Sequence, residues 1–193
     1  MVEALKTRLQ IATSLLVLIW VIFLIEAIIP GFDLRTWGIL PRHVSGLFPG
    51  IIAAPLLHGG LWHIVANSIP LFVLSFLVSL HGGGRLLRVG ITVTLVGGLL
   101  VWLFGRNAYH IGASGLVFGL WAYLLAYGYV KRDLKAIVIA MAVFIFYGGM
   151  VFGFLMSTPG VSVESHIFGA LAGVLCAIKD GCSKPKATTS LSN

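Results

Sequence analysis

The chain has 193 residues, of which 59% are hydrophobic and only 10% are charged, with a mean hydropathy of +1.03. Soluble domains carry about 25% charged residues, so this composition excludes a soluble domain and indicates a polytopic membrane protein. No polar segment is long enough for a separate soluble domain, and one compact bundle is therefore expected.

Six apolar runs follow one another along the chain, each close to the ~20 residues that a spanning helix needs. They cover approximately residues 11–29, 56–80, 86–104, 112–130, 136–156 and 163–179. The sequence thus predicts an all-α bundle of six transmembrane helices. We divide it into an N-terminal segment at 1–10, a membrane domain at 11–180 and a tail at 181–193.

The position of the basic residues predicts the orientation. Ten of the 13 lie in the N-terminal segment, the second and fourth loops and the tail, against three in the alternate loops, Arg35, Arg42 and Arg106. By the positive-inside rule both termini are cytoplasmic. The net charge of +7 is then a signal of topology, and no nucleic-acid partner is expected.

Cys176 and Cys182 fall in or near a reducing compartment, where no disulfide is expected.

The second apolar run opens with two histidines and an asparagine. His63 and Asn67 are four residues apart and share one face of a helix, whereas His58 precedes them in the entry turn. Polar groups within a bilayer need a partner or a purpose, so this pair is a candidate for a functional site. The sequence leaves the role of His58 open, with a structural role favoured over a part in the site.

The fourth run begins with Gly112-Ala-Ser114-Gly115, and two interpretations of it stand. The glycines and serine can be small residues that let a neighbouring helix approach closely, as is common in membrane bundles. Alternatively, Ser114 is a nucleophile, and the glycines admit substrate backbone beside it. The rest of the chain has to decide between them.

The sixth run carries His166, Gly169 and Gly173 on about the same side of one helix. The two glycines form a GxxxG face, so the histidine lies on the side that packs most closely against a neighbour. A further glycine pair in the fifth run, Gly148 and Gly149, is interpreted as a close-packing site more than as a hinge.

The predicted topology brings these groups to a common depth. The second, fourth and sixth helices all run from outside to inside, and His63, Ser114 and His166 lie one to two turns from their starts. A serine needs a base, for which His166 is the better candidate, and the oxyanion needs donors, for which His63, Asn67 and the Ser114 amide are candidates. Glu164 is two residues from His166 and does not face it, so a Ser-His dyad is predicted.

These three motifs, in this order, resemble those of the rhomboid intramembrane serine proteases of the six-helix bacterial type. His58-Gly-Gly-Leu-Trp-His63-Ile-Val-Ala-Asn67 is similar to the family's second-helix pattern. Gly112-Ala-Ser114-Gly115 resembles its GxSG motif, and His166-Ile-Phe-Gly169-Ala-Leu-Ala-Gly173 its HxxGxxxG motif. The resemblance covers residues 11 to 180.

The resemblance implies hydrolysis of peptide bonds in single-span membrane proteins near the outer face of a bacterial inner membrane. Ser114 would be the nucleophile and His166 the base, with His63 and Asn67 at the oxyanion. The residues expected to support the site are Phe118, stacked on the catalytic histidine, and Gly112, Gly115, Gly169 and Gly173. The fifth helix would correspond to the element often proposed as a lateral gate. No metal or organic cofactor is expected, because the histidines are too few and too separated for zinc.

Two other functions remain as alternatives. A rhomboid-like protein can bind membrane helices without cutting them, but such relatives usually lose the serine or the histidine that this chain keeps. A small channel or transporter is disfavoured because the ionisable residues gather near one face, with no comparable polar residues through the inner half. The oligomeric state and the natural substrate are not determined by the sequence.

Overall fold

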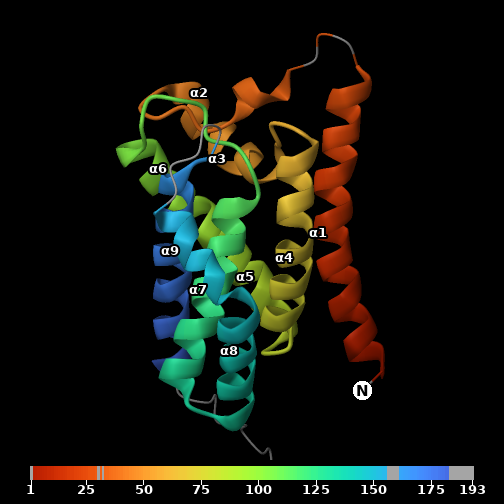
Figure 1. The fold of residues 1–193 in the computed structure, drawn as a ribbon, viewed down its shortest axis with the longest axis vertical. Coiled ribbons are helices and arrows are strands. Elements are labelled where there is room, and N and C mark those ends of the chain that lie inside the picture. Colours follow the sequence, from red (N-terminus) through yellow and green to blue (C-terminus); the bar gives the residue numbers. More distant parts are fainter. Residues whose placement is uncertain (1, 30, 32, 156–160, 183–193) are drawn as a thin grey trace, which may run out of the picture.

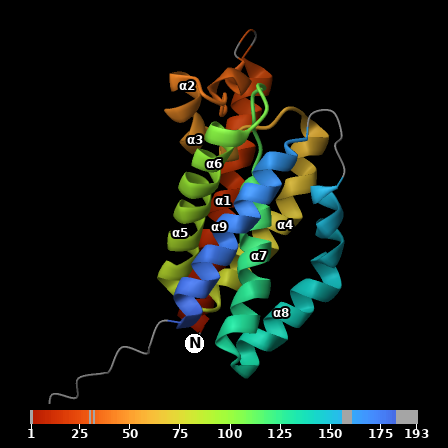
Figure 2. The same cartoon turned by 90° about the vertical axis from the view of Figure 1, so that its left-hand side faces the viewer.

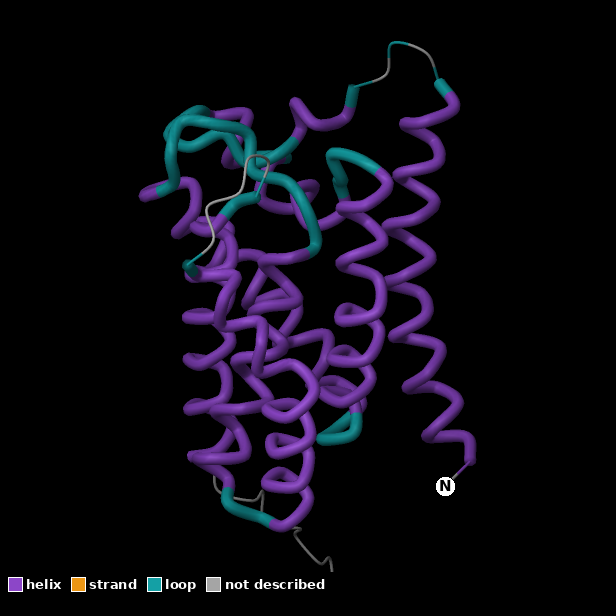
Figure 3. Tube along the Cα trace, in the orientation of Figure 1, coloured by secondary structure: helices purple, strands orange, loops and turns teal. Residues whose placement is uncertain are grey.

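A computed structural model describes residues 2–29, 31, 33–155 and 161–182 (Figure 1). Most of the predicted tail, residues 183–193, lies outside the described residues. The elements are α1 (Val2–Ile28), η1 (Leu34–Trp37), α2 (Val44–Leu47), α3 (Gly50–Ala53), η2 (Ala54–Leu56), α4 (Leu61–Ser79), α5 (Gly83–Thr92), η3 (Val93–Gly97), α6 (Gly98–Phe104), α7 (Ser114–Lys131), α8 (Leu134–Tyr147), η4 (Gly148–Phe154) and α9 (Val163–Cys182). Among the described residues the fold is all-helical, without strands, as Figure 3 shows.

Four helical segments are long and apolar enough to cross a membrane: Val2–Ile28, Leu61–Ser79, Gly84–Phe104 and Leu134–Phe154. The all-α membrane architecture predicted from composition is therefore confirmed. The first of these segments is a continuous helix that includes residues 2–10, so the predicted boundary at residue 10 is not a break in the helix.

The remaining long helices are α7, which lies at the centre of the bundle, and α9, which packs on it from one side. They pack more extensively against each other than any other pair, and α7 also contacts α4 and α8 (Figure 2). α1 packs on α4 at one side of the molecule, and the rod formed by α5, η3 and α6 packs on α9. A change in the α7–α9 contact would therefore reach most of the fold.

Glycines bring the backbones of α7 and α9 together. A Cβ atom at Gly169 would collide with the carbonyl oxygen of Gly115, and one at Gly173 with that of Gly119. The GxxxG face of α9 thus packs on a second set of small residues, Gly115 and Gly119, one turn apart on α7. The close-packing interpretation of the glycines around Ser114 holds, and it does not compete with a catalytic role for the serine.

Two of the predicted runs are irregular helices. The third contains a π-helical turn, η3, between α5 and α6, and the fifth tightens from α8 into the 3₁₀ segment η4 at Gly148. The close-packing interpretation of Gly148 and Gly149 is wrong: nothing lies within 4 Å of a Cβ at Gly149, and only the Phe144 ring lies as near as 4.0 Å to one at Gly148. The pair marks the change of helix type instead, since glycine imposes little on the backbone.

The helices α4, α7 and α9 all begin at the same end of the bundle (Figure 1). The segment between α1 and α4, with its short helices α2 and α3, covers that end. We call it the loop end, and the opposite end, where α1 begins and α7 passes into α8, the turn end. The candidate residues of the sequence analysis lie at the loop end.

Candidate active site

Ser114 is the first residue of α7, and a short tethered loop leads to it. In that loop His110 pairs with Ile39 through two backbone hydrogen bonds, of 2.9 and 3.0 Å, and Gly112 donates to the carbonyl of Ala54 at 2.9 Å. As the first residue of a helix, Ser114 has an N–H that no carbonyl of its own helix accepts. The nucleophile candidate therefore combines a hydroxyl and a free backbone donor at a fixed position.

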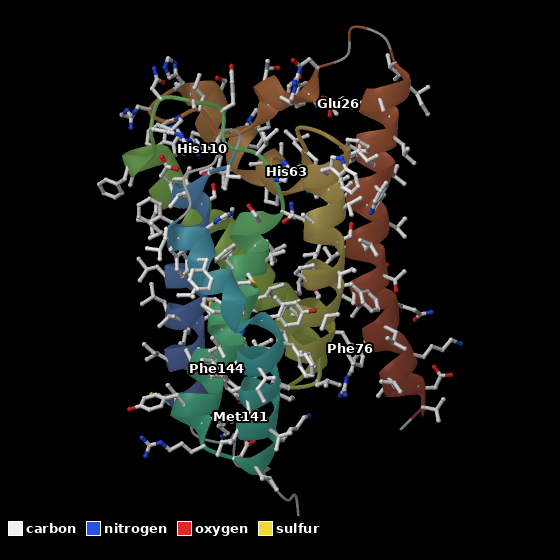
Figure 4. The ribbon with its side chains drawn as sticks, viewed as in Figure 1. Glu26, His63, Phe76, His110, Met141 and Phe144 are labelled. Carbon is white, nitrogen blue, oxygen red and sulfur yellow. The ribbon has the colours of Figure 1, made fainter. Side chains whose placement is uncertain are left out.

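Gly112 lies between this serine and His63 on α4. Its φ of +117° favours glycine, and a Cβ there would approach His63 Nε2 to 2.6 Å and Ser114 Oγ to 3.8 Å. The two polar atoms consequently border the same small space, which a side chain at 112 would fill. Figure 4 shows His63 at the loop end of the bundle.

The hydrogen bonds around α4 determine which ring nitrogen of His63 carries a proton and can donate it. Its Nδ1 accepts from the N–H of Gly59 at 3.4 Å, so the ring proton is carried by Nε2, on the side of Gly112 and Ser114. Asn67 is buried and donates one Nδ2 hydrogen to the carbonyl of His63 at 2.9 Å. His63 thus presents an N–H group near the start of α7, whereas one Nδ2 hydrogen of Asn67 is engaged within α4.

His166 is held in a single orientation by two contacts. Its ring stacks on Phe118 with the centroids 4.0 Å apart and the planes 10° apart, and Nδ1 donates to the carbonyl of Gly153 at 3.0 Å. Because Nδ1 carries the proton, Nε2 has a lone pair. The Gly115–Gly169 contact brings the first turn of α9 against that of α7, which carries Ser114. No direct hydrogen bond joins Ser114 to His166 in the part of the chain that the structure describes; such bonds are often long in free enzymes.

Gly153 was not anticipated from the sequence. It contributes a backbone carbonyl, which has no signature in a sequence, and its lack of a side chain is required. A Cβ at this position would lie 2.5 Å from Phe118 Cζ and 3.4 Å from His166 Nδ1. η4, which follows the glycine pair of α8, thereby participates in the orientation of the histidine.

His58 lies buried in the turn before α4, in contact with the loop that precedes the serine. Its Nε2 accepts from the N–H of Ala113 at 3.4 Å, and its ring meets that of His63 edge-on at 5.1 Å. Burial, with the nearby His63, lowers the pKa of His58 to about 4. Neutral His58 accepts a hydrogen bond from the residue next to Ser114, a structural contact.

A second network, which the sequence analysis missed, joins the Ser114 loop to the start of α9. His110 is buried; its Nε2 donates to the carbonyl of Arg106 at 3.0 Å and its Nδ1 accepts from the hydroxyl of Ser162 at 2.6 Å (labelled His110 in Figure 4). Ser162 Oγ accepts in turn from the hydroxyl of Ser165 at 2.7 Å and from its N–H at 3.1 Å, as an N-terminal cap of α9. Burial lowers the pKa of His110, which favours its neutral form. We call His110, Ser162 and Ser165 the neutral network.

Glu164 is paired with Arg106 and not with His166. Its Oε2 lies 3.5 Å from the Arg106 guanidinium, and its Oε1 accepts from the Arg106 N–H at 3.3 Å. Arg106 also donates to the carbonyl of Val161 at 2.5 Å. The carboxylate therefore joins the Ser114 loop to α9 from the partly exposed side of the site.

Comparison with known proteins agrees with these motifs. A family model described as the Rhomboid domain matches residues 45–181. Uncharacterized protein Rv1337 of Mycobacterium tuberculosis is 40% identical over an alignment of 176 residues that covers 86% of this chain and 73% of that protein. Uncharacterized protein ML1171 of Mycobacterium leprae is 42% identical over 137 residues, 66% and 54% of the two chains. The putative rhomboid protease YdcA of Bacillus subtilis is 28% identical over 135 residues, 65% and 63% of the two chains.

The chain belongs to the rhomboid family, as its three motifs predicted. Its apolar helices and this membership make it a multi-pass integral membrane protein. Membership also supports an intramembrane protease-like function.

Proposed function

We propose that the protein is an intramembrane serine endopeptidase with Ser114 as nucleophile and His166 as general base. The observation that carries the proposal is the environment of His166. Its ring is stacked on Phe118, its Nδ1–H donates to the Gly153 carbonyl, and the lone pair of its Nε2 can accept a proton. A third, acidic residue is not needed to orient this imidazole, since ring stacking and a carbonyl do so.

The reaction follows from the atoms present. Ser114 Oγ passes its proton to His166 Nε2 as the bond from Oγ to the scissile carbon forms. The carbonyl oxygen becomes an oxyanion, which the Nε2–H of His63, the Nδ2 of Asn67 and the Ser114 N–H are suited to stabilise. When the carbon–nitrogen bond breaks, His166 returns the proton to the leaving amine, and a water molecule repeats the sequence to release the acyl group. No step requires a metal or an organic cofactor.

A groove between α4 and α8 offers a lateral approach for a substrate helix. It has a volume of about 400 Å³ and is lined by Val73, Leu77, Ala142, Val143, Phe146 and Tyr147. α8 packs mainly on α7, which leaves its contact with α4 slight. A single-span membrane protein is therefore the proposed substrate class, with the segment to be cut unwound before attack, because helical carbonyls are occupied by their own hydrogen bonds.

The proposed topology has six membrane crossings with both termini in the cytoplasm of a bacterial cell. α7 and α9 supply the fourth and sixth crossings, and the rod from α5 to α6 the third. The basic residues Arg85, Arg88, Lys131, Arg132, Lys135 and Lys179 then flank helix ends at the turn end, as the positive-inside rule requires. The active site opens toward the outer face.

Cleavage of a fluorescent single-span substrate by the purified protein in proteoliposomes tests the proposal. We expect wild-type protein to cut the substrate and the Ser114→Ala and His166→Ala variants to be inactive, with unchanged elution on gel filtration. Cleavage that persists without Ser114 would refute the serine mechanism. Wild-type protein that retains the substrate in a pull-down but never cuts it would support the alternative, a membrane-helix binding protein.

A further inference from the structure

The segment η4 supplies the carbonyl that orients His166, and only part of the segment packs on the bundle. Its sequence, from Gly148 to Phe154, contains four side chains besides its glycines. Val151 and Phe152 are 45% and 59% exposed. The other two, Met150 and Phe154, pack against the buried core. The position of η4 therefore depends on these two contacts, of which Phe154 is the one next to the carbonyl.

The Phe154 ring belongs to a cluster of three aromatic rings beside the imidazole. Its centroid lies 5.1 Å from that of Phe118 and 6.0 Å from that of Trp121, with the planes tilted by 57° and 56°. Phe118 and Trp121 are in turn 6.1 Å apart, so the three rings contact one another in a closed triangle. One face of Phe118 is covered by His166, which is stacked at 4.0 Å. Phe154 and Trp121 therefore hold Phe118 against the histidine from its other sides.

Phe154 also restricts the direction of the carbonyl that accepts the Nδ1 proton of His166. The Gly153–Phe154 peptide is planar, so the Gly153 C=O lies in one plane with the N and Cα of Phe154. A fixed Phe154 ring consequently limits the rotation of this plane. The Gly153 backbone itself lies against the Phe118 ring, because a Cβ there would be 2.5 Å from Phe118 Cζ. Both contacts of His166, the stacked ring and the 3.0 Å hydrogen bond, thus depend on the same side chain.

We propose that Phe154 is a positioning residue for the general base His166. The inference rests on the proposed function, in which His166 takes the proton of Ser114. Phe154 acts through Phe118 and the Gly153 carbonyl. Without its ring, Phe118 is no longer held on one side and the Gly153 peptide can rotate, so the imidazole loses both of its fixed contacts.

The expected consequence is a change in the tautomer of His166. When Nδ1 donates to the Gly153 carbonyl, Nε2 keeps its lone pair and can accept the Ser114 proton. When that hydrogen bond is lost, the ring proton is shared between the two nitrogens, and the molecules that carry it on Nε2 cannot act as a base. Phe154 does not line the groove between α4 and α8, so substrate binding should change less than the rate of the reaction.

Nitrogen NMR of the imidazole rings tests the proposal without a substrate. Protein labelled with ¹⁵N-histidine is measured in detergent micelles, and His166→Gln identifies the His166 signals among the six histidines. In wild-type protein we expect two well-separated ring signals, with the proton on Nδ1. In Phe154→Ala the two signals should move toward each other as the tautomers exchange. Phe152→Ala removes an exposed ring from the same segment and, as the matched control, should leave the signals unchanged.

Kinetics with a graded pair of variants completes the test. Phe154→Ala should lower kcat about tenfold to a hundredfold and change KM by less than about threefold. Phe154→Leu keeps apolar bulk, is the variant to measure where Phe154→Ala does not fold, and should show smaller changes in the same direction. Unchanged His166 signals in both Phe154 variants, or equal changes in Phe152→Ala, would overturn the proposal. If the signals respond as expected but wild-type protein never cleaves its substrate, the positioning role is supported and the protease assignment is refuted.

Discussion

The two ends of α9 are attached to the rest of the bundle by different chemistry. At the loop end, Ser162 and Ser165 connect α9 to His110 through neutral hydrogen bonds. At the turn end, Asp180 connects it to Arg85 and Arg88 through ion pairs. The loop end also has an ion pair, between Arg106 and Glu164, but solvent screens it because both side chains are partly exposed, whereas the Asp180 carboxylate at the turn end is buried.

Removal of the ion pairs that Asp180 forms with Arg85 and Arg88 should have the largest effect on stability. In Asp180→Ala two arginines lose a buried partner, and we expect the free energy of unfolding to fall by about 3–5 kcal/mol. Chemical denaturation in detergent micelles measures this. Cleavage per folded molecule should stay near the wild-type value, since Asp180 lies at the turn end, away from Ser114.

Asp33→Ala is the matched control for that experiment. Asp33 pairs with Arg35 at 2.8 Å, and both side chains are about half exposed. Exposed pairs contribute about 0–1 kcal/mol, so the control should be close to wild type. Similar losses of stability in Asp33→Ala and Asp180→Ala would contradict the account of the turn end.

Disruption of the neutral network should instead affect catalysis. His110→Phe keeps an aromatic ring but removes the acceptor for Ser162 and the donor to Arg106, so the Ser114 loop is no longer fixed against α9. We expect kcat to fall by about tenfold to a hundredfold, because small displacements of reacting groups are costly, with stability lowered by about 1–3 kcal/mol.

Ser162→Ala and the double variant complete a cycle with His110→Phe. If the two side chains act through their shared hydrogen bond, the double variant should lose little more activity than His110→Phe alone. Additive losses, or an unchanged kcat in His110→Phe, would show that the network does not position the nucleophile.

Acid should weaken the fold through His58, which is buried at the loop end. The pKa of His58 is lowered to about 4 in the folded protein, so the unfolded chain, with an ordinary histidine pKa near 6.5, binds a proton that the folded protein excludes. Stability is then fully present above about pH 6.5 and declines as the pH falls toward 4. Thermal unfolding at pH 7.5 and 4.5 should show this loss, and His58→Phe should reduce the pH dependence; an unchanged dependence would contradict it.

The smallest effect is expected at the exposed ion pair of the loop end. Arg106 and Glu164 are 46% and 21% exposed at their side chains, so the pair is screened by solvent. Glu164→Gln should change stability by less than about 1 kcal/mol and kcat by less than about threefold. A loss of activity as large as in His166→Ala would instead make Glu164 a third catalytic residue.

Side-chain spacing allowed much of the site to be predicted. Periodicity placed His63 and Asn67 on one helix face and His166 on the glycine face of α9, and the structure brings both faces to the start of α7. Phe118, placed by resemblance, stacks on His166. The roles of these residues in catalysis stay predictions.

The missed residues share a physical reason. His110 and Ser162 meet across 52 positions of sequence, and Gly153 acts through its carbonyl, so neither contact has a local pattern. The glycine pair in the fifth run was misinterpreted because a glycine that permits close packing and one that permits a change of helix type are identical in sequence. Only the surrounding helices distinguish them.

The central claim is that His166 activates Ser114, and covalent labelling tests it most directly. Wild-type protein in detergent is treated with a fluorophosphonate, and intact and peptide mass spectrometry locate the adduct. The account predicts one adduct, on Ser114, and its loss in His166→Ala although the serine is still present. Labelling of another residue, or equal labelling of Ser114 without His166, would contradict it.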